Sequence, residues 1–159
     1  MARPAGAENV VVRRSGVHGR GLFAARDIRK GERVIEYVGE KVGKREGTRR
    51  TEAQWARGRI YTFELNSRQD VDGGFAWNTA RLANHSCAPN CESEIVRGRI
   101  WIVALRDIAA GQEITYDYNF PVEEDLLKCR CGAKRCRGYV VGSGYGRQLA
   151  AWKRRHGVA

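Results

Sequence analysis

Arg81-Leu-Ala-Asn-His-Ser-Cys-Ala-Pro-Asn-Cys91 brings two amides, an imidazole, two thiols and a proline into one short stretch. These residues repeat at neither a helical nor a strand period, so fold formation alone does not require them. A matching segment lies downstream, at Cys129-Arg-Cys131-Gly-Ala-Lys-Arg-Cys136. It offers three thiols, one fewer than a closed zinc site needs. The two stretches together indicate one built site.

The cysteine spacing favours a metal. Three thiols in a C-x-C-x4-C pattern are more typical of a zinc site than of disulfides in a reducing compartment. Cys87 is the economical fourth ligand, because it lies in the other unexplained stretch. We therefore expect Zn²⁺ bound by Cys87, Cys129, Cys131 and Cys136. Free or disulfide-linked thiols are the alternative. Cys91 is left over, and we interpret it as a small buried hydrophobe.

The composition is that of one globular domain. With 159 residues, of which 42% are hydrophobic, the chain can bury a core and carry a small appendage. No apolar run approaches the roughly 18 residues of a membrane span, so we expect no membrane contact. The N-terminus has no apolar segment, and we expect no secretory signal.

The chain is strongly basic. Its formal net charge is +11 and its pI is about 9.9. The basic residues cluster at 13–14, 44–50, 128–137 and 153–155, without aromatics between them. They indicate either a solvated surface or affinity for nucleic acid or another polyanion. The tail from Arg147 to Ala159 is either a short basic helix with Leu149 and Trp152 on one face or disordered.

The pattern of apolar residues predicts a mostly β chain with small helical insertions. We expect a helix from Thr48 to Trp55, strands at 9–13, 33–38, 60–65, 94–96, 99–105 and 112–118, and a strand followed by a turn through Asp72-Gly73-Gly74 within 68–76. The expected strands at 94–96 and 99–105 form a hairpin with its turn at Arg97-Gly98. Residues 26–34 resemble residues 106–114, which we interpret as one turn solution used twice.

Three further motifs carry chemistry in other proteins. Gly19-Arg-Gly21-Leu-Phe-Ala24 matches a dinucleotide-binding pattern, but no βαβ unit follows, so a smaller adenosine-type ligand fits better. His85 and Ser86 are adjacent and point apart, and no G-x-S-x-G elbow is present, which disfavours a hydrolase. Tyr116 and Tyr118 share one strand face, with Asp117 on the other. Tyr37 and Tyr61 hold comparable strand positions, so four phenols are expected to converge.

Four motifs then occur in order, followed by the cysteine segment: His18-Gly-Arg-Gly-Leu-Phe23, Tyr37-Val-Gly39, the 81–91 stretch, and Gln112-Glu-Ile-Thr-Tyr-Asp-Tyr118. This combination resembles the SET-domain protein lysine methyltransferases with a post-SET zinc motif, over about residues 9–140. The resemblance implies a mostly β SET-domain fold of several small sheets with a knot-like crossover, a short helical insert and a C-terminal zinc-binding post-SET segment. It divides the chain into a catalytic domain at 9–120 with an insert at about 40–80, a zinc segment at 121–140 and a basic tail at 141–159.

The resemblance also implies site residues. S-adenosylmethionine would fill one pocket, and a substrate lysine would enter from the opposite face through a narrow channel. The residues that match the family's cofactor site are His18, Gly19, Arg20, Gly21, Asn84, His85 and, through its main chain, Arg130. Tyr118 matches the catalytic tyrosine and Tyr61 lines the lysine channel, and both border the cofactor. Tyr116 holds the position that limits the number of methyl groups, so we expect mono- or dimethylation. The four cysteines match the zinc ligands.

The chain departs from the family pattern in ways that bear on its substrate. It has no Cys-rich segment before residue 9, Leu82 replaces an aromatic, and the surface is basic. The resemblance implies a histone tail or another basic protein as the substrate, including a bacterial one, whereas the basic surface is unfavourable for a basic histone tail. We expect an intracellular protein, cytoplasmic if bacterial and nuclear or chromatin-bound if it acts on histones. The basic patches suggest contact with DNA or a nucleoprotein. A zinc-stapled binding module without catalysis is the alternative.

Overall fold

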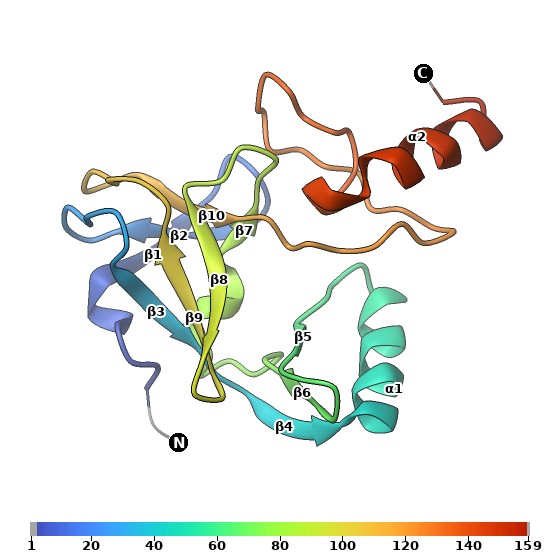
Figure 1. The fold of residues 1–159 in the computed structure, drawn as a ribbon. Coiled ribbons are helices and arrows are strands. Elements are labelled where there is room, and N and C mark those ends of the chain that lie inside the picture. The colour runs from blue at the N-terminus through green and yellow to red at the C-terminus, as the bar shows by residue number, and fades with distance from the viewer. Residues whose placement is uncertain (1–2, 159) are drawn as a thin grey trace.

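The structure, a computed structural model, describes residues 3–158 and is mostly β, as expected (Figure 1). A seven-stranded sheet has the order β1-β2-β10-β8-β9-β3, with β7 paired to β10. Its strands are β1 (Val10–Arg14), β2 (Arg20–Ala24), β3 (Arg33–Tyr37), β7 (Asn84–His85), β8 (Cys91–Val96), β9 (Arg99–Ala104) and β10 (Glu113–Tyr116).

Strand β10 brings the two informative stretches of sequence together. It pairs antiparallel with β2 and parallel with both β7 and β8. The register sets Thr115 opposite Asn84 and Tyr116 opposite His85. The end of β10 therefore lies directly beside the 81–91 stretch, and this pairing positions the site.

The expected hairpin is present between β8 and β9. Its two-residue turn, Arg97-Gly98, has φ values of 50° and 71°. Two positive φ values are typical of the type I′ turn, whose twist matches that of the flanking strands. Strand β9 is buried over most of its length because it lies between β8 and β3, and Ile100 and Ile102 lie in the core.

A second sheet, β4-β6-β5, forms the insert together with one helix (Figure 1). Its strands are β4 (Glu40–Gly43), β5 (Thr62–Glu64) and β6 (Gln69–Asp72), and the helix is α1 (Lys44–Trp55). The helix begins four residues earlier than expected, and strand β5 is shorter than the range 60–65. Strand β6 lies within the stretch 68–76, which was expected to hold a strand and a turn. Gly47 lets the helix approach β6, since a Cβ there would lie 2.1 Å from the Asp70 carboxylate.

The internal repeat is a pair of turns that contact each other. Ile28 and Ile108 form a β-bridge, and both are buried. The backbone N–H of Lys30 donates to Asp107, and that of Ala110 donates to Asp27. Gly31 and Gly111 have φ values of 83° and 85°, which favour glycine. The interpretation as one turn solution used twice is confirmed, with the addition that the two copies bond reciprocally.

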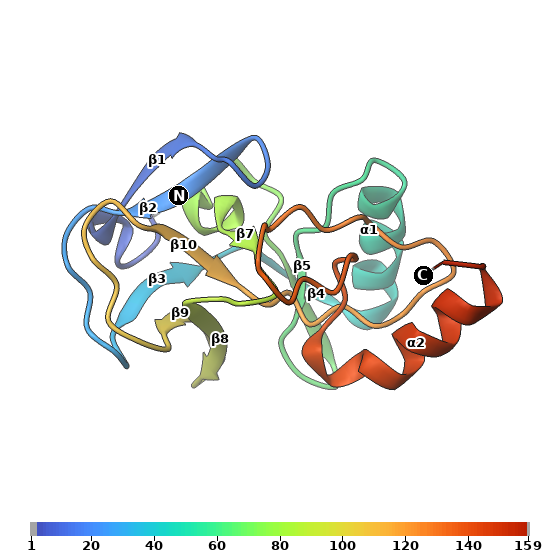
Figure 2. The same cartoon turned by 90° about the horizontal axis from the view of Figure 1, so that it is seen from above.

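The C-terminal part is an irregular segment that ends in η3 (Ser143–Tyr145) and α2 (Gly146–Arg155). Leu149 and Trp152 are buried, and the Trp152 indole N–H donates to the Glu124 carbonyl at 3.0 Å. The basic tail is thus an ordered helix, the first of the two alternatives. Figure 2 shows α2 on the side of the molecule that carries α1, away from β1 and β3.

The core lies under the seven-stranded sheet and includes Leu22, Val34, Ile35 and Ile114. Two short 3-10 helices, η1 (Ala7–Asn9) and η2 (Thr79–Leu82), contact β3 and each contributes a buried alanine, Ala7 and Ala80, to the core. Within residues 3–158, neither α1 nor α2 has the length and apolarity needed to cross a membrane.

Candidate functional site

A pocket of about 550 Å³ opens where the seven-stranded sheet, the insert and the C-terminal segment meet. A volume of this size suits a cofactor or a drug-sized ligand. Most of the sequence-predicted cofactor residues line it, namely His18, Gly19, Arg20, Tyr61, Asn84, His85, Tyr118 and Arg130. Residues without a predicted role complete the wall, among them Val17, Ile60, Arg81, Leu82, Phe120, Leu127 and Val140.

Asn84 is held by a network that the sequence did not indicate. Its Nδ2 donates to Glu113 Oε1 at 2.9 Å and to the Arg20 carbonyl at 3.2 Å. Glu113 also accepts from the Ser15 hydroxyl at 2.7 Å, and that hydroxyl accepts from the Val17 N–H at 2.9 Å. The carboxylate therefore fixes the amide and the start of the glycine loop together. Its only sequence signal was its place in the 112–118 motif.

Gly21 supports this network and does not line the pocket. A Cβ at this position would lie 2.3 Å from Glu113 Oε1 and 3.1 Å from Asn84 Nδ2. The glycine is required because it leaves space for that pair. The sequence-based role of Gly21 at the cofactor remains a prediction, whereas its packing role follows from the geometry.

His85 bridges the end of β10 and the cysteine cluster. Its Nδ1 accepts from the Tyr118 N–H at 3.2 Å, and its Nε2 lies 3.6 Å from Cys87 Sγ. Because Nδ1 is an acceptor, the proton of the neutral ring belongs on Nε2. Burial lowers the pKa of His85 to about 4, opposed by Asp117 and assisted by the charge of Arg137. The neutral ring thus has both nitrogens occupied within the protein and acts as a positioning group.

The four tyrosines converge, as expected. The Tyr118 hydroxyl donates to the Ala83 carbonyl at 2.8 Å, and its ring centroid lies 4.9 Å from that of Tyr116. Tyr37 donates to the Tyr61 carbonyl at 2.8 Å. Phe63 fills the space between, 4.5 Å from Tyr37 and 5.9 Å from Tyr116 by ring centroids.

Tyr37, Tyr116 and Tyr118 stay neutral. Burial raises the pKa of Tyr118, and burial also raises the pKa values of Tyr37 and Tyr116 well above the ordinary value. Tyr116 lies behind Tyr118 rather than in the pocket wall, with 5% of its surface exposed. No described residue between positions 3 and 158 hydrogen-bonds its hydroxyl. The rings of Tyr37, Phe63, Tyr116 and Tyr118 form a packed aromatic cluster next to the pocket.

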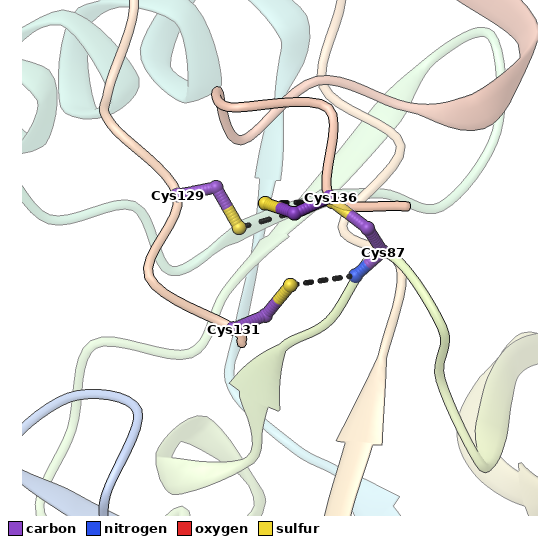
Figure 3. Close-up of side chains that lie close together, drawn as sticks. All are labelled: Cys87, Cys129, Cys131 and Cys136. Atoms are coloured by element: carbon purple, nitrogen blue, oxygen red, sulfur yellow. Dashed lines mark hydrogen bonds between the residues drawn. The ribbon is translucent and has the colours of Figure 1, made fainter. Parts of the chain in front are cut away.

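The four expected zinc ligands come together (Figure 3). The sulfurs of Cys87, Cys129, Cys131 and Cys136 all lie within 4.8 Å of one another. Cys87 Sγ is 3.8 Å from Cys129 Sγ and 3.9 Å from Cys136 Sγ. A tetrahedral site with Zn–S bonds of about 2.3 Å places its sulfurs about 3.8 Å apart.

The surroundings also suit a zinc–thiolate centre. Backbone N–H groups of Cys87, Arg137 and Gly138 point at the sulfurs at 3.4 Å, as partners of charged thiolates do. None of the five cysteines is in a disulfide. Cys91 is fully buried in the core, which confirms its interpretation as a small hydrophobe.

An ion pair connects the metal segment to the tyrosine strand. Asp117 Oδ2 accepts from Arg137 Nη2 at 2.7 Å and from the Ser143 N–H at 3.1 Å. Both side chains are mostly buried. Asp117 thus fixes the chain between Tyr116 and Tyr118 against the C-terminal segment. The sequence placed it on the face opposite the tyrosines but gave no partner, since Arg137 lies 20 residues away.

Comparison with known proteins agrees with this geometry. Residues 19–119 match the SET domain family. The chain is 45% identical over 136 residues to the histone-lysine N-methyltransferase trithorax of Drosophila virilis, covering 82% of this chain and 4% of that protein. It is 45% identical over 133 residues to the H3 lysine-4 specific histone-lysine N-methyltransferase of Schizosaccharomyces pombe, covering 79% of this chain and 14% of that protein.

Human histone-lysine N-methyltransferase 2B is 44% identical over 140 residues, which cover 84% of this chain and 5% of that protein. The chain thus spans a small fraction of the length of these relatives. The family match covers strands β2 to β10 and the pocket residues Asn84, His85 and Tyr118. Three of the four clustered cysteines follow the match, and the cluster is consistent with a post-SET zinc segment. The chain therefore belongs to the SET-domain family.

Proposed function

We propose that this chain is an S-adenosylmethionine-dependent protein-lysine N-methyltransferase that mono- or dimethylates a lysine of histone H3. The observation that carries the proposal is the position of Tyr118, which forms part of the pocket wall and also packs against the buried ring of Tyr116. Lysine 4 is the preferred candidate, because the fission yeast relative is named for that residue. Action on H3 implies a nuclear or chromatin location.

The pocket suits the cofactor in size and in the groups it presents. Asn84 uses its amide nitrogen inside the protein, and no described residue of 3–158 donates to its Oδ1, which is left to accept from a ligand. Backbone groups of the glycine loop at 18–20 and of Arg130 border the same space. When bound, S-adenosylmethionine supplies a methyl group on a positively charged sulfur.

The aromatic cluster beside the pocket is suited to prepare a substrate lysine. An amine must lose its proton before its lone pair can form the new N–C bond, and for a free lysine at pH 7.4 this costs about 4 kcal/mol. A dry aromatic surrounding disfavours the ammonium and lowers that cost. The Tyr118 phenol is held by Ala83 and its own pKa is raised, so it orients the reacting groups and is not a base. Catalysis is then mostly alignment.

The test is methyl transfer from labelled S-adenosylmethionine to core histones and, in parallel, to a bacterial lysate, with the modified residue located by mass spectrometry. Tyr118→Phe should reduce turnover by about a hundredfold or more while cofactor affinity changes little. Tyr145→Phe, in η3 and outside the pocket, is the matched control and should retain activity.

Label on H3 that disappears only in Tyr118→Phe supports the proposal. Label only on a bacterial protein would retain the activity and replace the substrate. Unchanged turnover in Tyr118→Phe would refute the role of this tyrosine. A protein that binds no S-adenosylmethionine would be the zinc-stapled binding module instead.

A further inference from the structure

The positive charge is concentrated at one end of the chain. Nine of the 29 Lys and Arg residues, and none of the 18 Asp and Glu residues, lie between Leu126 and Ala159. We call residues 126–158 the basic segment. The rest of the chain is close to neutral, because its acidic and basic residues nearly balance. The net charge of +11 therefore belongs mostly to the basic segment.

Most of this charge has no partner in the protein. Of the nine side chains, Arg137 alone forms an ion pair among the residues that the structure describes. Among the other 20 Lys and Arg residues, which lie within residues 3–125, five form ion pairs, as in Arg26–Glu32, Arg50–Asp72 and Arg99–Glu36, and the 18 acidic residues of the chain lie in the same part of the sequence. The exposed members of the basic segment are Lys128, Arg130, Lys134, Arg135, Arg147, Arg154 and Arg155.

Helix α2 holds part of this charge in a fixed direction. Leu149 and Trp152 are buried, and the Trp152 ring packs 5.1 Å from Tyr139 by centroids. At 3.6 residues per turn, Arg147 and Arg154 lie opposite that buried face, two turns and about 10 Å apart. The buried side chains of Leu149 and Trp152 thus fix the orientation of the helix, and Arg147 and Arg154 point outward from its opposite face.

The chemistry of this surface fits an array of phosphates. Exposed cations without internal partners gain most from an external polyanion, by displacing its condensed counterions. Trp152 is buried and the basic residues have no exposed aromatics between them, so the surface lacks the stacking groups that single-stranded nucleic acid uses. Contact with a duplex backbone needs only the charges.

We infer that the basic segment, centred on the outer face of α2, is a docking surface for the phosphate backbone of duplex DNA. The inference deepens the proposed function and rests on it, because histone H3 is met in nucleosomes, where DNA wraps the histones. Docking on that DNA would hold the pocket close to a histone tail and raise the tail's local concentration. Binding is independent of base sequence.

The experiment measures binding of the intact chain to a labelled mixed-sequence DNA duplex by fluorescence anisotropy, without histone or S-adenosylmethionine, from about 0.05 to about 0.2 M salt. The variant is Arg147→Gln/Arg154→Gln/Arg155→Gln. Arg13→Gln/Arg14→Gln/Arg29→Gln removes the same charge from exposed positions outside the basic segment and the pocket. Single-stranded RNA and phosphatidylserine vesicles are the competing ligands.

The α2 variant should bind DNA about tenfold or more weakly and lose about two to three units of salt slope, since each phosphate contact adds about 0.9. The control variant should retain most of the DNA affinity and most of the salt slope. Equal losses in the two variants, absence of duplex binding at about 0.1 M salt, or tighter binding to RNA or vesicles would overturn the inference.

A methylation arm separates this inference from the proposed function. With both functions correct, the α2 variant methylates free H3 like the wild type and loses activity on nucleosomes. DNA binding that depends on α2 in a protein that transfers no methyl group would sustain the docking surface and reject the proposed function. Normal methylation of free H3 by a protein that does not bind DNA would sustain the proposed function and reject the docking surface.

Discussion

At the scale of single residues, Glu113 decides how the cofactor loop is held. One carboxylate accepts from Asn84 and Ser15, and through them it fixes the loop that begins after β1. Hydrogen bonds to a charged group contribute about 1.5–3 kcal/mol each. Glu113→Ala should therefore weaken S-adenosylmethionine binding about tenfold or more, with a smaller change in kcat.

Isothermal titration calorimetry and the split between KM and kcat measure this effect. Glu113→Gln retains one acceptor and should restore part of the affinity. Glu92→Ala removes an exposed strand carboxylate that contacts no pocket residue, and it should leave affinity unchanged. A loss of stability without any change in cofactor affinity would mean that Glu113 is merely structural.

The Tyr116 hydroxyl sets a second prediction at this scale. It points from a buried ring beside Tyr118 and has no partner among residues 3–158, so it is available to hold the amine or a water. Tyr116→Phe removes that group and leaves space for another methyl. The product should shift toward di- and trimethyllysine, as read by mass spectrometry of the peptide product. Trimethyllysine as the main product of the native chain would contradict this.

At the scale of elements, helix α1 is fastened to its sheet by charge. Glu46 accepts from Arg49 and Arg50, and Arg50 also reaches Asp72 on β6. Hydrogen bonds from Arg49 and then Arg50 lower the pKa of Glu46 from 4.5 to about 2. A carboxyl group whose pKa is lower in the folded state stabilises the fold at pH values above its pKa in the unfolded state. This contribution is lost as the pH falls through the pKa of the folded state.

Glu46→Gln should therefore lower the free energy of unfolding at pH 7 by a small amount, because the group is exposed. The difference from the wild type should shrink between about pH 4.5 and pH 2. Urea unfolding at a series of pH values measures it. Glu52→Gln, on the same helix without an ion pair, should show no such dependence, and a pH-independent deficit in Glu46→Gln would argue against the pairing.

Some elements were predictable because their signals are local. The β8–β9 hairpin has its turn residues at the turn, and α2 has its two apolar residues at helical spacing. Strands β2, β4 and β7 were missed. Residues 20–24 match a glycine-loop motif in sequence, and they form strand β2 because β1 and β10 pair with both of its edges. Strand β7 has two residues and exists only through β10.

The residues of the site likewise fall into those with a local sequence signal and those without one. Its cysteines, Asn84 and Tyr118 lie in short motifs that a sequence displays. Glu113 with Ser15, and Asp117 with Arg137, are pairs separated by 98 and 20 residues. No spacing rule joins such residues, and their partnership follows only from the fold that brings β10 against β2 and the C-terminal segment.

At the scale of the whole molecule, the four-cysteine centre joins the sheet domain to the C-terminal segment. Cys87 belongs to the sheet domain, and the other three sulfurs belong to the C-terminal segment. That segment supplies one wall of the pocket, through Leu127, Lys128, Cys129, Arg130 and Val140. Cofactor affinity should therefore depend on the metal, although the metal takes no part in the transfer.

We predict one Zn²⁺ per chain by elemental analysis. Its removal by a chelator should weaken S-adenosylmethionine binding about tenfold or more and open residues 128–155 to trypsin, while the sheet domain stays protected, because structural zinc supplies folding free energy to the segment it closes. Cys87→Ser should reproduce both effects. Cys91→Ala, which alters a core thiol outside the cluster, should retain the metal. A chain that contains no zinc yet binds the cofactor and resists trypsin like the untreated protein would show that hydrogen bonds and the Asp117–Arg137 pair suffice to hold the two parts together.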